Sequence, residues 1–207
     1  MKHKFEAIKK AMIPRMDKFG FVAKGKDAFV KTEGAREVKI ALSYRRGRGV
    51  GFESTIFISA MANIAFNNLN REERKVIDDV LTSYPVIGGS IKHYYEPDPG
   101  YLTIAANEEA KDDEVVQELM FYIENGAFHL FEEYPSLNKV LASIEGKDKN
   151  LDEYHKFLDF RSAIRLATIR YLVEGKGAAV AWFDSLEVFS EDLKKEVILG
   201  KMKSNWN

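Results

Sequence analysis

The spacing of apolar residues changes near residue 108, and this change limits the folds open to the chain. Before it, Val38, Ile40 and Leu42 alternate with mostly polar residues, which is typical of a strand with one buried face. From Glu108 onward, apolar residues recur at intervals of three and four, as on one face of a helix. Because the strands come first and the helices follow, rather than alternating with them, the pattern predicts an α+β fold.

The first half of the chain is predicted to hold two helices and a sheet of about five strands. Asn70 and Glu73 have the spacing of a capping box, and Pro14 lies inside the first helix, where a proline kinks or divides it. The second hairpin is expected around the turn 97–100, which is rich in Pro and Gly. The expected elements are a helix at 3–19, a strand meander at 28–32, 36–44 and 51–60, a helix at 71–83, and a hairpin at 90–96 and 101–106.

The second half is predicted to form a helical layer that packs against this sheet. Asn125-Gly126 favours a kink or a break in the first long helix, and Gly175 to Gly177 ends a largely buried central one. The expected helices are about 108–131 with that break, 136–144, 152–174, 178–189 and 190–202. The chain divides into a sheet region at 1–107 and a helical region at 108–207, which we expect to form one compact unit.

Composition excludes several classes of protein. The chain of 207 residues has no cysteine, so a disulfide framework, a thiolate metal site and a cysteine nucleophile are all excluded. No apolar stretch approaches the roughly eighteen residues that span a bilayer. The N-terminus opens with a charged amphipathic segment instead of the apolar core of a secretory signal. We therefore expect a soluble cytoplasmic protein.

Charge is segregated along the chain. The first fifty residues carry fourteen Lys and Arg against five Asp and Glu, whereas the rest carry seventeen against twenty-seven. The segment from Glu96 to Glu133 contains eleven acidic residues and one lysine. Such asymmetry is informative about the partners that a protein binds rather than about its fold. The two zones either pack against each other, which cancels the dipole internally, or face solvent as separate binding surfaces.

The basic zone has its highest charge density at the predicted hairpin tip from Arg45 to Gly49. Guanidinium groups match phosphate oxygens, so Arg45, Arg46 and Arg48, with Lys39 on the preceding strand, are candidates for binding an anion or nucleic acid. The alternative is that charges at a hairpin tip keep a sheet edge soluble and unpaired. The glycine spacing is not that of a phosphate-binding loop.

The acidic zone offers a candidate protein interface. Its candidate residues stand at the start of a predicted helix, where the macrodipole also favours negative charge. They are Glu108, Glu109, Asp112, Asp113 and Glu114. An acidic surface of this kind suits a protein that masks a basic partner, for example an inhibitor of a nuclease.

No catalytic motif was found in the sequence. His129 with Glu132 and Glu133, and His155 with Asp152 and Asp159, have the helical spacing of metal ligands, but such spacings arise by chance in a chain that is 30% charged. Arg161 and Arg165 lie one turn apart in the most apolar helix, and are expected either to form structural ion pairs or to contact an anion in a cleft. We predict no cofactor and no metal, and an enzyme is unsupported.

Two segments carry a family resemblance. After the first helix come Gly20-Phe21, Lys24 or Lys26, and Phe29-Val30-Lys31, and in this the opening roughly sixty residues resemble an uncharacterised group of bacterial α+β domains of unknown function. The C-terminal segment is similar to the ending of such domains and of some immunity-type proteins from bacterial toxin systems. That segment contains Ile169 to Leu172, Gly175, Ala178, Ala181, Trp182 and Phe183. The resemblance implies an α+β fold and supplies no catalytic residues.

These observations give a leading hypothesis and two alternatives. The leading one is a non-catalytic bacterial protein that binds another protein, such as a toxin, in the manner of an antitoxin or immunity factor. The first alternative is a nucleic-acid or phosphorylated-ligand binder that uses Arg45 to Arg48. The second is a metal-dependent enzyme that uses His129 or His155.

Overall fold

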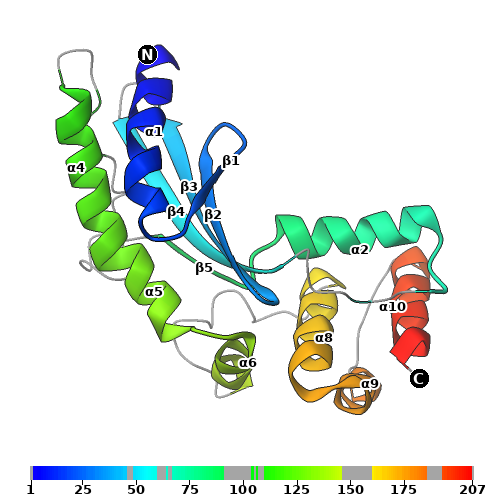
Figure 1. Cartoon of the computed structure of the whole chain (residues 1–207). Coiled ribbons are helices and arrows are strands. Elements are labelled where there is room, and N and C mark those ends of the chain that lie inside the picture. The colour runs from blue at the N-terminus through cyan, green and yellow to red at the C-terminus, as the bar shows by residue number, and fades with distance from the viewer. Residues whose placement is uncertain are drawn as a thin grey trace. The chain divides into compact units, whose positions relative to one another are not determined.

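The computed structural model describes most of the chain and confirms the α+β class (Figure 1). It describes residues 2–45, 49–59, 64, 67–90, 104, 106, 110–145, 160–185 and 193–206. The strands are β1 Val22–Lys24, β2 Ala28–Glu33, β3 Arg36–Arg45, β4 Gly49–Ile58 and β5 Ile87–Ser90. The helices are α1 Lys2–Asp17, α2 Arg71–Ser83, α4 Asp112–Tyr122, α5 Phe128–Glu133, α6 Leu137–Glu145, α8 Phe160–Glu174, α9 Lys176–Asp184 and α10 Leu193–Trp206.

The chain forms two compact units, and each combines segments from both sides of residue 107. Unit 1 comprises Met1–Glu33, Glu37–Ile56 and Gly88–Pro135. Unit 2 comprises Gly34–Arg36, Phe57–Ile87 and Ser136–Asn207. Unit 1 therefore holds most of the sheet with α1, α4 and α5, and unit 2 holds α2, α6, α8, α9 and α10.

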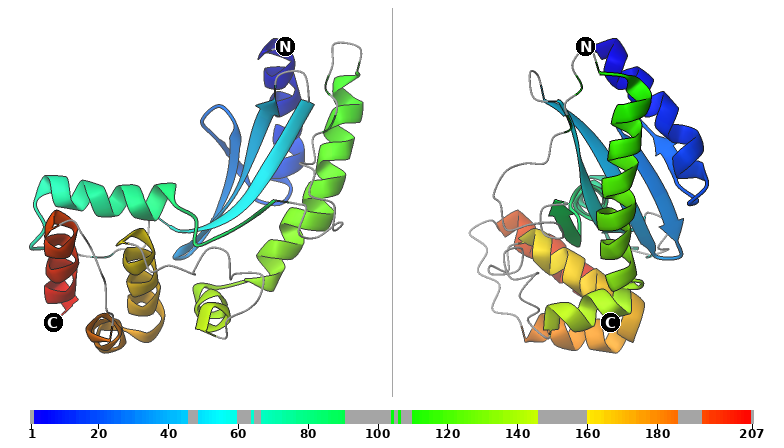
Figure 2. Two further views of the ribbon diagram at one scale, coloured as in Figure 1. Left: turned by 180° about the vertical axis from the view of Figure 1, so that it is seen from behind. Right: turned by 90° about the vertical axis from the view of Figure 1, so that its left-hand side faces the viewer.

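Helix α1 runs through Pro14 as a single helix, so of the two outcomes expected at this proline, a kink or a division, the division does not occur. α1 ends at Asp17, and the turn that follows it closes at Gly20, whose φ of 80° lies in the left-handed region that favours glycine. There the N–H groups of Gly20 and Phe21 donate to the carbonyls of Asp17 and Met16, at 2.9 and 3.1 Å. In unit 1, α1 lies across one face of the sheet with α4 beside it (Figures 1 and 2).

The sheet has the strand order β1-β2-β3-β4-β5, so its first four strands follow one another as a meander. β1 pairs antiparallel with β2, with Val22 opposite Val30. The alternation predicted in β3 is confirmed, because Val38, Ile40 and Leu42 are all buried. β1 was not predicted from the sequence, because its three residues are too few to show a period.

The predicted second hairpin is described only in part. β5 meets the strand expected at 90–96 at Ser90, and residues 91–103 lie outside the described part of the chain. Ile104, within the strand expected at 101–106, forms an antiparallel bridge with Val50 in β4, with N–O distances of 2.8 and 2.9 Å. Both segments thus contact the sheet.

The break predicted at Asn125-Gly126 is a π-helical turn over Ile123–Ala127 that joins α4 to α5 without a loop. In this turn Ile123, Gly126 and Ala127 are buried, and Glu124 and Asn125 are exposed. The Asn125 side chain donates to the Phe121 carbonyl at 2.7 Å, so this side chain bonds to the turn of helix that precedes it.

Helix α8 is the centre of unit 2, as the sequence predicts. Every residue from Ser162 to Ile169 is buried, and α8 contacts α2, α6 and α9. Its Ala163, Ile164 and Ala167 join a core cluster. The cluster also contains Ile64, Ile77, Val80, Ala179, Ile198, Leu199, Met202 and Trp206.

Replacing Thr168 with valine is expected to raise the thermal stability of the protein. Thr168 is fully buried in α8, and its hydroxyl makes no hydrogen bond in the part of the chain that is described. A valine of the same shape removes the cost of burying that hydroxyl, which is about 1–3 kcal/mol for an unsatisfied group. Thermal unfolding should show a higher Tm.

A control for this substitution lies on the same helix. Ser162 is also buried, but its hydroxyl accepts from the Arg165 guanidinium at 3.0 Å, so Ser162→Ala should lower the Tm. A lower Tm for Thr168→Val would contradict the account of its hydroxyl.

Candidate protein interface

Helix α4 is held to α1 by its apolar side and by one ion pair at its start. Val115, Val116 and Leu119 are buried on that side. The Lys4 ammonium lies 3.5 Å from the Asp112 carboxylate and donates to the Ala110 carbonyl. Only 14% of the Lys4 side chain is exposed, so the basic and acidic zones do meet at this point.

The opposite side of α4 and α5 is an exposed acidic face. The π-helical turn keeps this face continuous, because its exposed positions lie at spacings that continue those of α4. We call this the acidic face; its exposed carboxylates belong to Asp113, Glu114, Glu118, Glu124, Glu132 and Glu133. The basic and acidic zones are therefore paired at Lys4 and Asp112, whereas the carboxylates of the acidic face are exposed to solvent.

Phe121 lies on the acidic face and is 55% exposed. Its ring packs edge-on against Tyr122 at a centroid distance of 5.4 Å. Phe121 was not among the functional residues predicted from the sequence. The signal was present, because position 121 falls outside the apolar stripe formed by Val115, Leu119 and Ile123.

The predicted acidic interface residues are placed only in part. Asp113 and Glu114 are exposed in the first turn of α4, and Lys111 pairs with Glu114 at 3.1 Å. Asp112 forms the ion pair with Lys4 that is described above. Glu108 and Glu109 lie outside the described residues.

The basic hairpin tip is largely outside the described part of the chain. Arg46 and Arg48 are not described, and for Arg45 the backbone is described as the last residue of β3. Lys39 is half-buried in β3, and its carbonyl accepts from the Thr55 hydroxyl at 3.4 Å.

Several lysines of the basic zone make contacts inside unit 1. Lys24 lies 3.7 Å from Glu37, and Lys31 lies 2.8 Å from Glu33. Lys9 is buried, donates to the Gly25 carbonyl at 2.6 Å and places its ammonium 5.9 Å from the centroid of the Phe29 ring. These contacts use part of the positive charge for structure.

Arg161 and Arg165 both reach the segment that follows α2. The Arg161 guanidinium lies 4.3 Å from the centroid of the Tyr84 ring, and the buried Arg165 donates to the Pro85 carbonyl. Arg165 also donates to the Arg161 carbonyl and to the Ser162 hydroxyl, at 3.3 and 3.0 Å. These contacts fix the Tyr84-Pro85 segment to α8.

The histidine sets are placed in part. His129 and Glu132 are exposed on α5, with their side chains 3.6 Å apart. Across the described ranges, no group of three His, Asp or Glu side chains has the arrangement of a metal site. Asp152, His155 and Asp159 lie outside those ranges.

Comparison with known proteins returns no relative. No family model, no curated protein and no solved structure matches this chain. Among the described helices, none has both the length and the apolar character needed to cross a membrane.

Proposed function

We propose that this chain is a non-catalytic bacterial protein of the antitoxin or immunity type, and that it binds a basic partner protein through the acidic face of α4 and α5. The observation that carries the proposal is the exposed Phe121 among the carboxylates of Glu114, Glu118 and Glu124. Aromatic residues are enriched in protein interfaces, where a few large side chains carry most of the binding energy and a polar rim surrounds them.

The charges and the aromatic ring have separate roles in this proposal. Six exposed carboxylates attract a basic surface and accelerate association, while charges at the rim contribute little to the final affinity. Phe121 loses its water contacts when it enters an apolar pocket of the partner, so its removal raises the dissociation rate. The buried opposite side of α4 holds the face rigid, which lowers the entropy lost on binding.

The test begins with identification of the partner, by use of the full chain as bait in an extract of its source and by purification of the retained basic protein. Calorimetry then compares the affinity of the wild type with that of Phe121→Ala, and stopped-flow kinetics compares the association rate of the wild type with that of the triple variant Glu114→Gln, Glu118→Gln, Glu124→Gln. We expect Phe121→Ala to weaken binding by at least about 30-fold, as for a central aromatic residue. The triple variant should flatten the salt dependence of the association rate.

Matched controls lie on α10, in unit 2. Val197 is 51% exposed and Glu196 is exposed, so Val197→Ala and Glu196→Gln change an apolar and an acidic residue outside the acidic face. Both should bind as the wild type does. Unchanged affinity of Phe121→Ala, together with an unchanged salt dependence of the association rate in the triple variant, would refute the proposal. Retention of the wild type on single-stranded DNA at low salt, lost on replacement of Arg45, Arg46 and Arg48, would favour the nucleic-acid alternative instead.

A further inference from the structure

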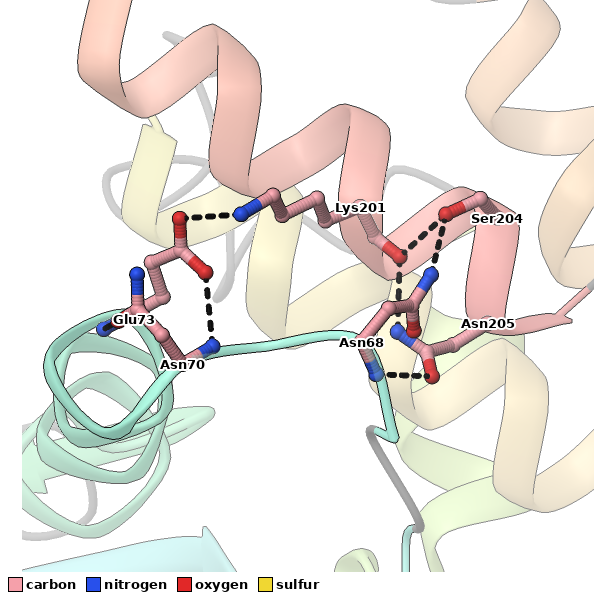
Figure 3. A network of polar contacts seen from close by, with 6 residues as sticks. All are labelled: Asn68, Asn70, Glu73, Lys201, Ser204 and Asn205. Atoms are coloured by element: carbon pink, nitrogen blue, oxygen red, sulfur yellow. Dashed lines mark hydrogen bonds and ion pairs between the residues drawn. The ribbon is translucent and has the colours of Figure 1, made fainter.

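Glu73 makes two contacts with its two carboxylate oxygens (Figure 3). Oε2 accepts from the N–H of Asn70 at 2.9 Å, and the Asn70 side chain accepts from the N–H of Glu73 at 2.9 Å, which completes the capping box at the start of α2. Oε1 accepts from the Lys201 ammonium of α10 at 2.6 Å.

The ionised form of Glu73 is favoured by both contacts. The bond from Lys201, followed by the bond from the Asn70 N–H, lowers the pKa of Glu73 below its ordinary value. The contribution of the charged carboxylate to stability is therefore present at neutral pH and is lost as the pH falls through this lowered pKa.

A second set of bonds joins the same two segments. The side-chain oxygen of Asn205 accepts from the N–H groups of Asn67 and Asn68, at 2.6 and 3.3 Å. The Asn68 amide donates to the Ser204 hydroxyl at 2.7 Å, and the Ser204 hydroxyl and the Asn205 amide both donate to the Lys201 carbonyl (Figure 3). The residues before α2 are thus bonded to the last turns of α10.

Apolar packing connects the same two helices. Met202 and Trp206 of α10 lie in the core cluster with Ile77 and Val80 of α2. α10 therefore covers part of this cluster, while its polar side is bonded to the N-terminus of α2. A displacement of α10 changes both its apolar and its polar contacts with α2.

We propose that Glu73 couples the N-terminal cap of α2 to the docking of α10, so that the two open together as one conformational unit. The cap holds the carboxylate where Oε1 can accept from Lys201, and Lys201 holds it where Oε2 can accept from Asn70. Weakening either contact therefore weakens the other, and the coupling acts equally in both directions, as thermodynamic linkage requires.

A double-mutant cycle tests this coupling. Asn70→Ala removes the cap, Lys201→Met removes the ion pair, and denaturant unfolding gives the stability of the wild type, both single variants and the double variant. Each substitution changes the unfolding equilibrium constant by some factor. If the two sites are coupled, the factor measured for the double variant should differ by at least about twofold from the product of the factors measured for the two single variants. In a Glu73→Gln background the cycle should become additive.

A matched control uses another ion pair of α10. Lys203 pairs with Asp184 of α9, so Lys203→Met removes a lysine from the same helix without touching Glu73. Asn70→Ala combined with Lys203→Met should be additive. Additivity of Asn70→Ala with Lys201→Met, equal to that of the control, would overturn the proposal.

Native-state hydrogen exchange of the single variants gives a second readout. Lys201→Met should accelerate exchange of the Glu73 and Arg74 amides, whose N–H groups bond to Asn70, and Asn70→Ala should accelerate exchange in α10 around Met202. Lys203→Met should leave the Glu73 and Arg74 amides unchanged. Local effects confined to the helix that carries each substitution would also overturn the coupling.

Discussion

Trp206→Ala is expected to lower the free energy of unfolding by about 3–5 kcal/mol, the range found when a buried aromatic residue is removed from a core. Trp206 is 2% exposed at the end of α10. Its ring stacks on Tyr171 at a centroid distance of 5.0 Å and lies 5.7 Å from Phe183. Its loss leaves a cavity between α8, α9 and α10, and urea unfolding measures the resulting change.

The expected effect of Trp206→Ala depends on burial rather than on its position near the C-terminus. Val197 lies on the same helix and is 51% exposed, so Val197→Ala should change the free energy of unfolding by no more than about 0.5 kcal/mol. If the two variants lost similar amounts of unfolding free energy, the conclusion that α10 packs on the core cluster through Trp206 would be wrong.

Phe29→Ala is expected to destabilise the protein by a similar amount, about 3–5 kcal/mol, from a site in unit 1. Phe29 in β2 has no exposed surface, and the Lys9 ammonium lies over its ring. The substitution opens a cavity in the core and also removes the aromatic face that the buried Lys9 contacts. Urea unfolding again gives the measurement.

Phe121→Ala is the control for Phe29→Ala, because it removes the same side chain from an exposed position. Its effect on stability should stay within about 0.5 kcal/mol, even though the same variant is expected to lose partner binding. A large loss of stability from Phe121→Ala would mean that Phe121 supports the fold, and the acidic face would then lose its proposed anchor.

Local features of the fold could be predicted from the sequence because their causes lie within a few residues. The capping box of Asn70 and Glu73, the alternating burial of β3 and the buried central helix α8 are all confirmed. At the π-helical turn the sequence predicted a kink or a break, since Asn-Gly weakens a helix, but the pattern does not show that the turn continues the helix by widening. The three residues of β1 were too few to show a period.

Contacts between distant segments could not be predicted in the same way. Lys201 and Glu73, or Lys4 and Asp112, are partners because the fold brings them together, and a chain with many charges offers many pairings of equal plausibility. Phe121 became a candidate once α4 showed which residues are buried. The charge segregation of the sequence was informative about surfaces, although it did not show that Asp112 is paired with Lys4 inside unit 1 while Glu114, Glu118 and Glu124 are exposed.

Each unit combines segments that are far apart in the sequence, and this has a consequence for folding during synthesis. Unit 2 takes its core residues from both ends of a long stretch of chain, because Ile77 and Val80 pack with Met202 and Trp206. A growing chain thus presents α2 well before its partners in α10 exist, and the apolar side of α2 stays uncovered by α10 until the last turns have left the ribosome. Translation, rather than the speed of helix formation, then sets the earliest moment at which this core can close.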